Sequence, residues 1–214
     1  MRKDIDCAQT LLAFSDGASF NNGKEGCVGG YSGYIPNVGY TMGFELDSSS
    51  QRAEILGVLS ILNYCKNRHI KNEIILVTDS GYVHGAITGE WYKSWSYKGW
   101  VTSTGEPVKN RDLWEKMLDI TQHVNLIGAL LIKGHIRKFK TESRNEQAVE
   151  EAYEKFITKN ELPGLDKARF LEYIEGNEFV DNKAVEAKDE AIANINANKG
   201  TVFVRKNNVA YIDF

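Results

Sequence analysis

The segment LLAFSDGASFNNGKEGCVGGYSGYIPNVGYTMGFEL, residues 11–46, decides the fold class. Its apolar run Leu11–Phe14 is typical of a buried strand, and Cys27–Ile35 and Tyr40–Leu46 predict two further strands. Turn-forming residues separate these strands: Gly17, Asn21, Asn22 and Gly23 in the first gap, and Pro36, Asn37 and Gly39 in the second. Because the connections are short, we expect an antiparallel meander.

After the meander, the pattern alternates between helices and strands. Ser48, Ser49 and Ser50 are candidate N-caps for the first helix. The predicted elements, in order, are a helix to about Asn67, a strand at Ile74–Val77, a helix to about Thr88, a helix near Asp112–His123 and a strand at Leu126–Ile132. This order predicts an α/β fold in which helices pack on the faces of a mixed sheet.

The last third of the chain predicts further helices and a terminal hairpin. Ser143 and Glu146 fit a capping box. A helical apolar stripe follows, formed by Ala148, Val149, Ala152, Tyr153, Phe156 and Ile157. Beyond Pro163-Gly164 we expect a short helix at Leu165–Ile174 ended by Gly176, another from about Glu178 to Asn196, and a hairpin at Thr201–Phe214 turning at Asn207-Asn208.

Composition excludes several classes of protein. The 214 residues are 42% hydrophobic and 26% charged, which is typical of a folded chain and excludes a largely disordered one. No apolar run approaches the roughly 20 residues of a membrane span, and Asp4 and Asp6 stand where a signal peptide is apolar. The three widely spaced cysteines form no CxxC motif, so a disulfide framework and a structural zinc site are not expected. We therefore expect a cytoplasmic protein with no membrane partner.

Positive charge is concentrated in two segments. The net charge of −3 argues against a chain whose whole surface binds nucleic acid. Residues 91–111 nevertheless carry Lys93, Lys98, Lys109 and Arg111 against Glu106 alone. Residues 133–144 carry Lys133, Arg137, Lys138, Lys140 and Arg144 against Glu142 alone. Such local fields can steer a polyanion.

Four acidic residues stand out by their positions. Asp16 and Asp79 each follow a predicted buried strand, Glu54 shares a helix face with apolar residues, and Asp181 lies in the first turn of the late helix. Each has an ordinary structural reading, since Asp-Gly favours turns, Asp-Ser favours helix starts, and Glu54 can pair with Arg52 or a distant lysine. The ends of adjacent strands lie side by side, however, so the four acids can also converge. Converging carboxylates raise one another's pKa unless a cation neutralises them, and oxygen ligands favour Mg²⁺ or Mn²⁺.

Five short motifs occur in a characteristic order: SDGAS at 15–19, QRAE at 51–54, TDSGYV at 78–83, KGH at 133–135 and GNEFVD at 176–181. They resemble the motifs of type 1 ribonuclease H, and ITGEWYKSWSYKGW…GEPVKNRDLWEKM within 87–117 resembles the basic protrusion of that family. The resemblance implies a ribonuclease H-like fold with a five-stranded mixed sheet, three antiparallel strands followed by parallel strands. It also implies a single domain over residues 1–200 with a helical insertion at about 136–176, and a C-terminal extension at 201–214.

The resemblance implies a function and a mechanism. The family is an endonuclease that hydrolyses the RNA strand of RNA–DNA hybrids and leaves 5′-phosphate products. Two metal ions, Mg²⁺ or Mn²⁺, would be held by the acids that match its motifs, which are Asp16, Glu54, Asp79 and Asp181. Asp16 is implied to bridge both ions. His135 matches a histidine that assists proton transfer or product release, although residues 136–176 separate it from the last motif and can reposition it, cover the site or contact substrate.

Substrate contacts are also implied by the resemblance. Asn22, Ser50 and Gln51 match contacts to sugars and backbone, where the 2′-hydroxyl distinguishes RNA, and Ser49 matches a DNA-phosphate contact. Asn22 is equally compatible with a plain turn. Lys93, Lys98 and Lys109 are candidate phosphate contacts, Trp91 and Trp114 are assigned to packing, and Trp95 and Trp100 are left open, with Trp95 kept as a candidate contact. Gly81 stands where the family often has Gln, so a minor-groove contact is expected to be missing.

Two alternatives remain open at this point. The chain can be a nucleic-acid-binding module of the same fold with weak catalysis, as the long insertion and Gly81 suggest. It can also be a nuclease of this fold that acts on DNA, such as a junction resolvase. We expect a monomer, and cleavage assays on hybrid and duplex DNA discriminate between the hypotheses.

Overall fold

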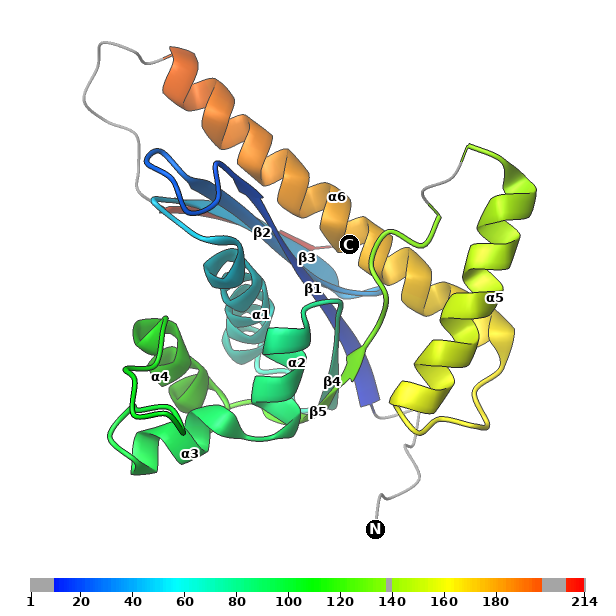
Figure 1. Cartoon of the computed structure of the whole chain (residues 1–214), viewed down its shortest axis with the longest axis horizontal. Coiled ribbons are helices and arrows are strands. Elements are labelled where there is room, and N and C mark those ends of the chain that lie inside the picture. Colours follow the sequence, from blue (N-terminus) through cyan, green and yellow to red (C-terminus); the bar gives the residue numbers. More distant parts are fainter. Residues whose placement is uncertain (1–9, 138–139, 198–206, 214) are drawn as a thin grey trace.

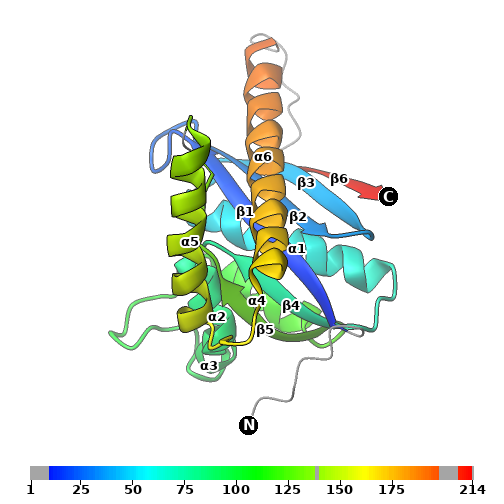
Figure 2. The same cartoon turned by 90° about the vertical axis from the view of Figure 1, so that its right-hand side faces the viewer.

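A mixed sheet forms the centre of the molecule (Figures 1 and 2). The computed structural model describes residues 10–137, 140–197 and 207–213, and within them the strand order is β5-β4-β1-β2-β3-β6. The antiparallel meander consists of β1 (Thr10–Phe20), β2 (Val28–Ile35) and β3 (Gly39–Leu46). Parallel to β1 lies β4 (Glu73–Thr78), and parallel to β4 lies β5 (Asn125–Leu131). The predicted arrangement of three antiparallel strands followed by parallel strands is confirmed.

Helices cover both faces of this sheet. On one face, α1 (Ser50–Asn67), α2 (Gly81–Thr88) and α4 (Arg111–Ile120) share an apolar core with the strands, and α3 (Trp91–Tyr97) joins α2 to α4. On the other face, α5 (Glu142–Lys159) and α6 (Lys167–Ala197) form a second core with Phe14, Val77 and Leu130. Figure 2 shows α6 and α1 on opposite sides of the strands. The functional side chains therefore come from both layers and from the sheet between them.

The start of α1 agrees with the sequence, but the end of β1 does not. Ser49 is the N-cap of α1, and its hydroxyl accepts the backbone N–H of Arg52 at 3.2 Å. The turn predicted at Gly17 is wrong, because β1 continues through Asp16 and Gly17 to Phe20. A Cβ on Gly17 would lie within 3 Å of the Glu54 backbone. Glycine at this position therefore lets α1 lie directly against β1.

A single long helix replaces the two helices predicted around Gly176. The expected end at Gly176 is wrong, because α6 runs without interruption for 31 residues. A Cβ on Gly176 would lie within 3 Å of the Phe14 ring, which is 1% exposed. Glycine disfavours a helix interior by about 1 kcal/mol relative to alanine, but here it allows α6 to pack closely on β1.

The segment between His135 and Gly176, predicted as a helical insertion, contains α5 and the first turns of α6. Its apolar stripe is buried as predicted at Ala148, Val149, Ala152 and Phe156. The predicted capping box is wrong, because α5 begins at Glu142 after the N-cap Thr141, so Ser143 lies inside the first turn. Asn160, the C-cap residue, is 4% exposed and hydrogen-bonds to the backbone of Leu131. The end of α5 is therefore attached to the end of β5.

The tail adds a strand to the sheet. β6 (Asn207–Asp213) pairs antiparallel with β3, so Asn207 and Asn208 lie opposite Glu45 and Phe44. The turn predicted at Asn207-Asn208 is therefore wrong, and residues 201–206, the other arm of the expected hairpin, lie outside the described residues. The strand extends the sheet beyond the five predicted strands.

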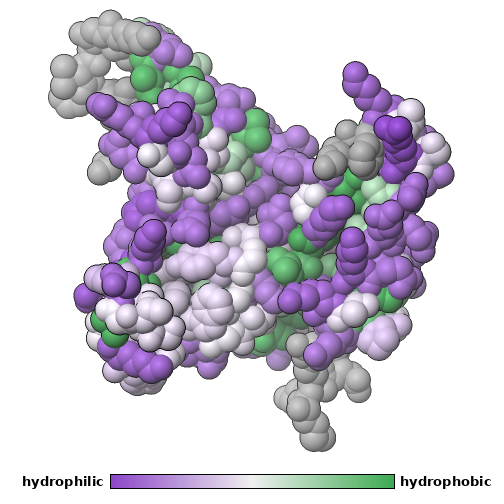
Figure 3. Space-filling view, in the orientation of Figure 1, coloured by the Kyte–Doolittle hydropathy of each residue, from purple (hydrophilic) through white to green (hydrophobic). Residues whose placement is uncertain are grey.

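The length and hydropathy of the described helices bear on membrane insertion, and Figure 3 shows the hydropathy of one face of the surface. Among the described residues, none of the helices combines the length and the apolar character that a bilayer span requires. The face seen in Figure 3 is mainly hydrophilic, and its apolar patches are small.

Candidate active site

Three carboxylates meet at the carboxyl end of β4. Asp16 comes from β1, Glu54 from α1 and Asp79 from the residue after β4. Each offers one oxygen, and these oxygens lie within 4.8 Å of one another. The parallel register explains the meeting, since Phe14 pairs with Val77 and both chains continue two residues to Asp16 and Asp79. The prediction that these two acids are neighbours is confirmed.

The fourth predicted acid adjoins this group from the opposite layer. Asp181 lies on α6, and its side chain is 28% exposed. It shares a hydrogen bond with Asp16, and its negative charge contributes to raising the pKa of Glu54 and of Asp79. The structure therefore gathers all four acids named from the sequence, with Asp181 at the more exposed border.

The electrostatics of this group favour a bound cation. Burial, then the charges of Asp79 and Asp181, raise the pKa of Asp16 to about 8, against the hydrogen bond donated by the Gly17 N–H at 2.7 Å. Burial and the charges of the other three acids raise the pKa of Glu54 to about 9. One carboxylate oxygen of Glu54, Oε2, is buried and has no hydrogen-bond partner in the described part of the chain. A divalent cation would relieve both the repulsion and this unpaired oxygen, and an all-oxygen donor set suits Mg²⁺ or Mn²⁺.

His135 lies at the exposed side of the group. Its Nδ1 is 3.2 Å from Oδ2 of Asp181, and the side chain is 65% exposed. The preceding Gly134 approaches so closely that a Cβ there would overlap Oδ2 of Asp79. Residues 136–176 therefore do not move His135 away from the acids, whereas cover of the site and contact with substrate stay predictions.

Asn177 belongs to the site and was missed as a candidate. It is 3% exposed on α6, and its side-chain hydrogen bond to Asp79 lowers the pKa of that acid, against the larger effect of burial. The signal lay within the motif GNEFVD, because Asn177 is one helical turn before Asp181 and therefore shares its face.

Four predicted substrate contacts gather at the N-terminus of α1. Asn22 is tied to Ser50 by two hydrogen bonds: its Nδ2 donates to the Ser50 hydroxyl, and its Oδ1 accepts the Ser50 N–H, both at 3.1 Å. Ser49 serves as the helix cap, and Gln51 is exposed. Ser50 and Gln51 lie about one helical turn before Glu54, and the hydrogen bonds to Ser50 bring Asn22 to the same end of α1.

Arg52 has a structural role that the sequence did not reveal. Its guanidinium binds Glu45 on β3 at 2.6 Å and Asp112 on α4 at 2.7 Å. These hydrogen bonds hold the pKa of Arg52 above its usual value and the pKa of Asp112 below its usual value. The alternative in which Glu54 pairs with Arg52 is therefore wrong, and Arg52 instead links α1 to α4.

The Trp-rich segment forms a packed protrusion around α3 and α4, which lie beyond α2 in Figure 1. Trp114 is fully buried and Trp100 is 9% exposed, whereas Trp91 is 41% exposed. Trp95 packs between Trp91 and Trp114, with ring centroids 6.0 and 5.8 Å away. Packing is thus confirmed for Trp114 and only partial for Trp91.

The candidate phosphate-binding lysines and Gly81 differ in their surroundings. Lys93 forms an ion pair with Glu90, whereas Lys98 and Lys109 are exposed and form no ion pair within the described ranges. Gly81, the first residue of α2, faces open space, since a Cβ there would meet nothing within 4 Å.

Comparisons with known proteins agree with this geometry. The sequence model of the RNase H family matches residues 8–156. The chain is 37% identical to Ribonuclease H of Hahella chejuensis (strain KCTC 2396) over 127 residues, which cover 59% of this chain and 82% of that protein. It is 34% identical to Ribonuclease HI of Xylella fastidiosa (strain 9a5c) over 127 residues, which cover 59% of this chain and 81% of that protein.

Two solved structures resemble the fold at low sequence identity. The crystal structure of LC11-RNase H1 in complex with an RNA/DNA hybrid matches with a TM-score of 0.52 and 13% identity, over 85% of this chain and 99% of that chain. Prototype Foamy Virus Protease-Reverse Transcriptase matches with a TM-score of 0.51 and 15% identity, over 83% of this chain and 20% of that chain. At these identities the likeness supports the architecture alone.

Proposed function

The chain belongs to the RNase H family, and from this premise we propose that it is an endonuclease that hydrolyses the RNA strand of RNA–DNA hybrids and leaves 5′-phosphate ends. The observation that carries the proposal is the meeting of Asp16, Glu54 and Asp79 within 4.8 Å. Asp181 joins them through its hydrogen bond to Asp16. Curated relatives named Ribonuclease H, of which this chain covers more than four fifths, support the same activity.

The four acids would hold two Mg²⁺ ions, with Mn²⁺ as a substitute. Bound in this way, divalent ions supply a water of lowered pKa and neutralise the leaving oxygen. The chain provides the oxygen ligands. Burial limits the access of water to Asp16, which is 6% exposed, and in part to the half-buried Glu54. Asn177 holds the carboxylate of Asp79 in a fixed position through its hydrogen bond.

We propose that His135 transfers protons during the reaction. Its imidazole lies against Asp181 on one side and is open to solvent over most of its surface. We assign it the transfer of a proton between solvent and the site, or the assistance of product release, as its motif implies. An imidazole suits this task because one ring nitrogen can accept a proton while the other donates one.

Substrate selection would come from the border of the site. Asn22, Ser50 and Gln51 are proposed to contact sugar and backbone of the hybrid, and Ser49 a DNA phosphate. Lys93, Lys98 and Lys109 are proposed phosphate contacts that carry no sequence information. The half-buried Trp95 is a further proposed contact. Gly81 offers no side chain to the minor groove. A monomeric state and a cytoplasmic location stay predictions from the sequence.

The test is a cleavage assay with a labelled hybrid, duplex DNA and duplex RNA. We expect the wild type to cut only the RNA of the hybrid when Mg²⁺ is present, and Asp16→Asn to bind the hybrid without cutting it. Wild-type cleavage of duplex DNA instead, or an Asp16→Asn variant as fast as the wild type, contradicts the proposal. Tight binding of the hybrid with no turnover in Mg²⁺ or Mn²⁺ would establish the binding-module alternative.

A further inference from the structure

The last turn of α5 is fixed at the edge of the sheet that carries the active site. Oδ1 of Asn160 accepts the Leu131 N–H at 2.9 Å, and its Nδ2 donates to the Leu131 carbonyl at 3.0 Å. Leu131 in turn pairs with Thr78, the residue before Asp79. A short chain of backbone contacts thus connects the end of α5 to a carboxylate of the site.

Packing fixes the orientation of α5 as well as its end. Phe156 is 3% exposed, and its ring centroid lies 5.1 Å from that of Phe170 and 5.2 Å from that of Tyr173, both on α6. Because this aromatic cluster holds one face of α5, the residues on the opposite face of the helix are fixed in orientation relative to the sheet. The helix is therefore a rigid platform for the side chains that it exposes.

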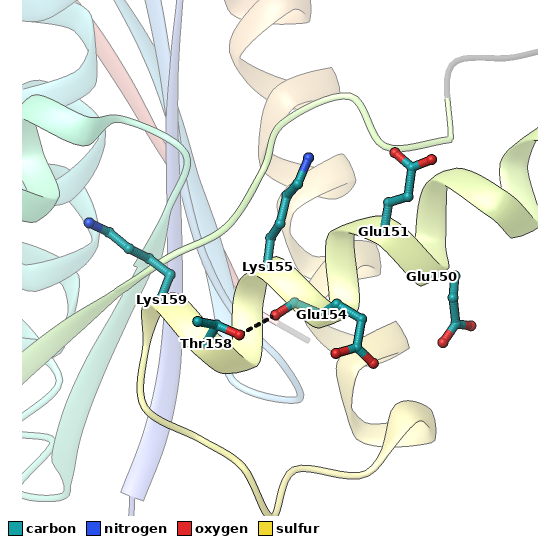
Figure 4. A pocket seen from close by; sticks show the side chains of 6 residues that line it. All are labelled: Glu150, Glu151, Glu154, Lys155, Thr158 and Lys159. Carbon is teal, nitrogen blue, oxygen red and sulfur yellow. Dashed lines mark hydrogen bonds between the residues drawn. The ribbon is translucent and has the colours of Figure 1, made fainter.

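Two lysines on this platform form what we call the α5 lysine face. Lys155 and Lys159 are one helical turn apart, exposed, and form no ion pair within the described residues. Figure 4 shows both lysines pointing away from Glu150 and Glu154, whereas Glu151 points to the same side as Lys155. All five of these charged residues, with Thr158, line one recess of about 850 Å³. Glu150 is occupied by its ion pair with Lys167.

The α5 lysine face is directed toward the site rather than away from it. The charge of Lys159 contributes, after burial, to lowering the pKa of His84 on α2, so Lys159 lies near the helix that begins two residues after Asp79. Figure 1 shows α5 on one side of α2 and the ends of the parallel strands, and α3 and α4 on the other. Exposed lysines therefore flank the carboxylates on both sides, with Lys98 and Lys109 on the second side.

We propose that the α5 lysine face binds backbone phosphates of the RNA–DNA hybrid on the side of the scissile bond opposite the α3–α4 protrusion. The inference rests on the proposed function, because it needs a polyanionic duplex laid across the carboxylates. Lysines bind phosphates through charge without reading the bases, so the contact lengthens the footprint on the duplex and leaves sequence preference unchanged.

The test compares Lys155→Gln/Lys159→Gln with a matched control, Lys66→Gln/Lys71→Gln. The control also removes two positive charges, but at the end of α1 and before β4, at the opposite end of the sheet from Asp79. Lys66 lies 3.5 Å from Asp119, so the thermal stability of the control is measured as well. We expect the α5 variant to raise KM for a long hybrid, to leave kcat unchanged, and to keep the thermal stability of the wild type. Two lost phosphate contacts reduce the salt dependence, so a fourfold rise in salt should weaken the wild type about tenfold more than the variant.

Substrate length separates a direct contact from an indirect effect. A hybrid too short to extend from the carboxylates to α5 should be cut equally by the wild type and the α5 variant. Equal KM values and salt slopes for the α5 variant and the control on long hybrids would overturn the inference and leave the nuclease function intact. A wild type that neither binds nor cuts the hybrid would instead overturn the proposed function, and this inference with it.

Discussion

Replacing Asp16 by Asn should stabilise the metal-free fold, and the gain should grow as the pH rises. Burial and the neighbouring charges of Asp79 and Asp181 raise the pKa of Asp16 from 3.8 to about 8. The folded chain therefore binds this proton more tightly than the unfolded chain. The stability contributed by the protonated form is complete below the unfolded pKa near 4 and is lost as the pH rises through the folded pKa near 8. An asparagine cannot ionise, so its contribution does not change over this window.

The magnitude follows from the same shift. One pKa unit corresponds to about 1.4 kcal/mol, and the wild type loses stability relative to the variant over about three units, from pH 5 to the folded pKa of about 8. The free energy of unfolding of Asp16→Asn should therefore gain about 2–4 kcal/mol on the wild type between pH 5 and pH 9. The titration of Glu54, whose pKa is raised to about 9, adds to the loss in the wild type.

Urea unfolding in the presence of a chelator, followed by tryptophan fluorescence, measures this difference. Asp47→Asn is the matched control, since Asp47 is exposed and lies outside the carboxylate group. Added Mg²⁺ should stabilise the wild type at pH 8 and have much less effect on Asp16→Asn. A difference between Asp16→Asn and the wild type that stays constant from pH 5 to pH 9 would refute the reasoning.

Three further predictions concern packing, an ion-pair link and proton transfer. Gly17→Ala should lower the free energy of unfolding by about 3 kcal/mol, because the added Cβ would meet the backbone of α1. Gly81→Ala, at a position that faces open space, should be neutral or stabilising by up to about 1 kcal/mol. Thermal melts of both variants measure these differences. Arg52→Gln should lower the free energy of unfolding by about 2 kcal/mol near neutral pH, and by less in acid, where the carboxylate partners of Arg52 become protonated. Equal losses at pH 3 and pH 7 in urea titrations would contradict this. His135→Ala should lower kcat at least about tenfold with KM unchanged, while His123→Ala on the turn after α4 should match the wild type in the same steady-state assay.

Local sequence signals predicted the elements that local physics determines. The β-branched and apolar run Ile74–Val77 has no plausible place except a buried strand, and Ser49 has the side chain and the position of an N-cap. The acids Asp16, Glu54, Asp79 and Asp181 were found by their order in known motifs, and the parallel register of β1 and β4 supplies the physical reason that the first and third meet.

The features that local patterns missed are those set by distant contacts. Gly17 and Gly176 have the propensity of a turn former and a helix breaker, yet each is the point where a helix touches β1 without space for a Cβ. Arg52 binds partners on β3 and α4, and Asn160 binds Leu131, which is 29 positions earlier in the chain. None of these partners is fixed by the residues beside them, because only the packed sheet brings them into reach.

The same close contacts explain how the fold tolerates a group that opposes folding. Buried carboxylates repel one another, and Glu54 retains an oxygen without a partner in the described chain. Gly17, Gly134 and Gly176 bring α1, the His135 loop and α6 against the strands, so the acids sit on elements whose apolar cores hold them together despite the repulsion. In such a site the ligands are in place before a cation binds. Cation binding then offsets the loss of folding stability that the repulsion between the carboxylates causes. Loosening one of these contacts should therefore harm metal affinity before it unfolds the chain.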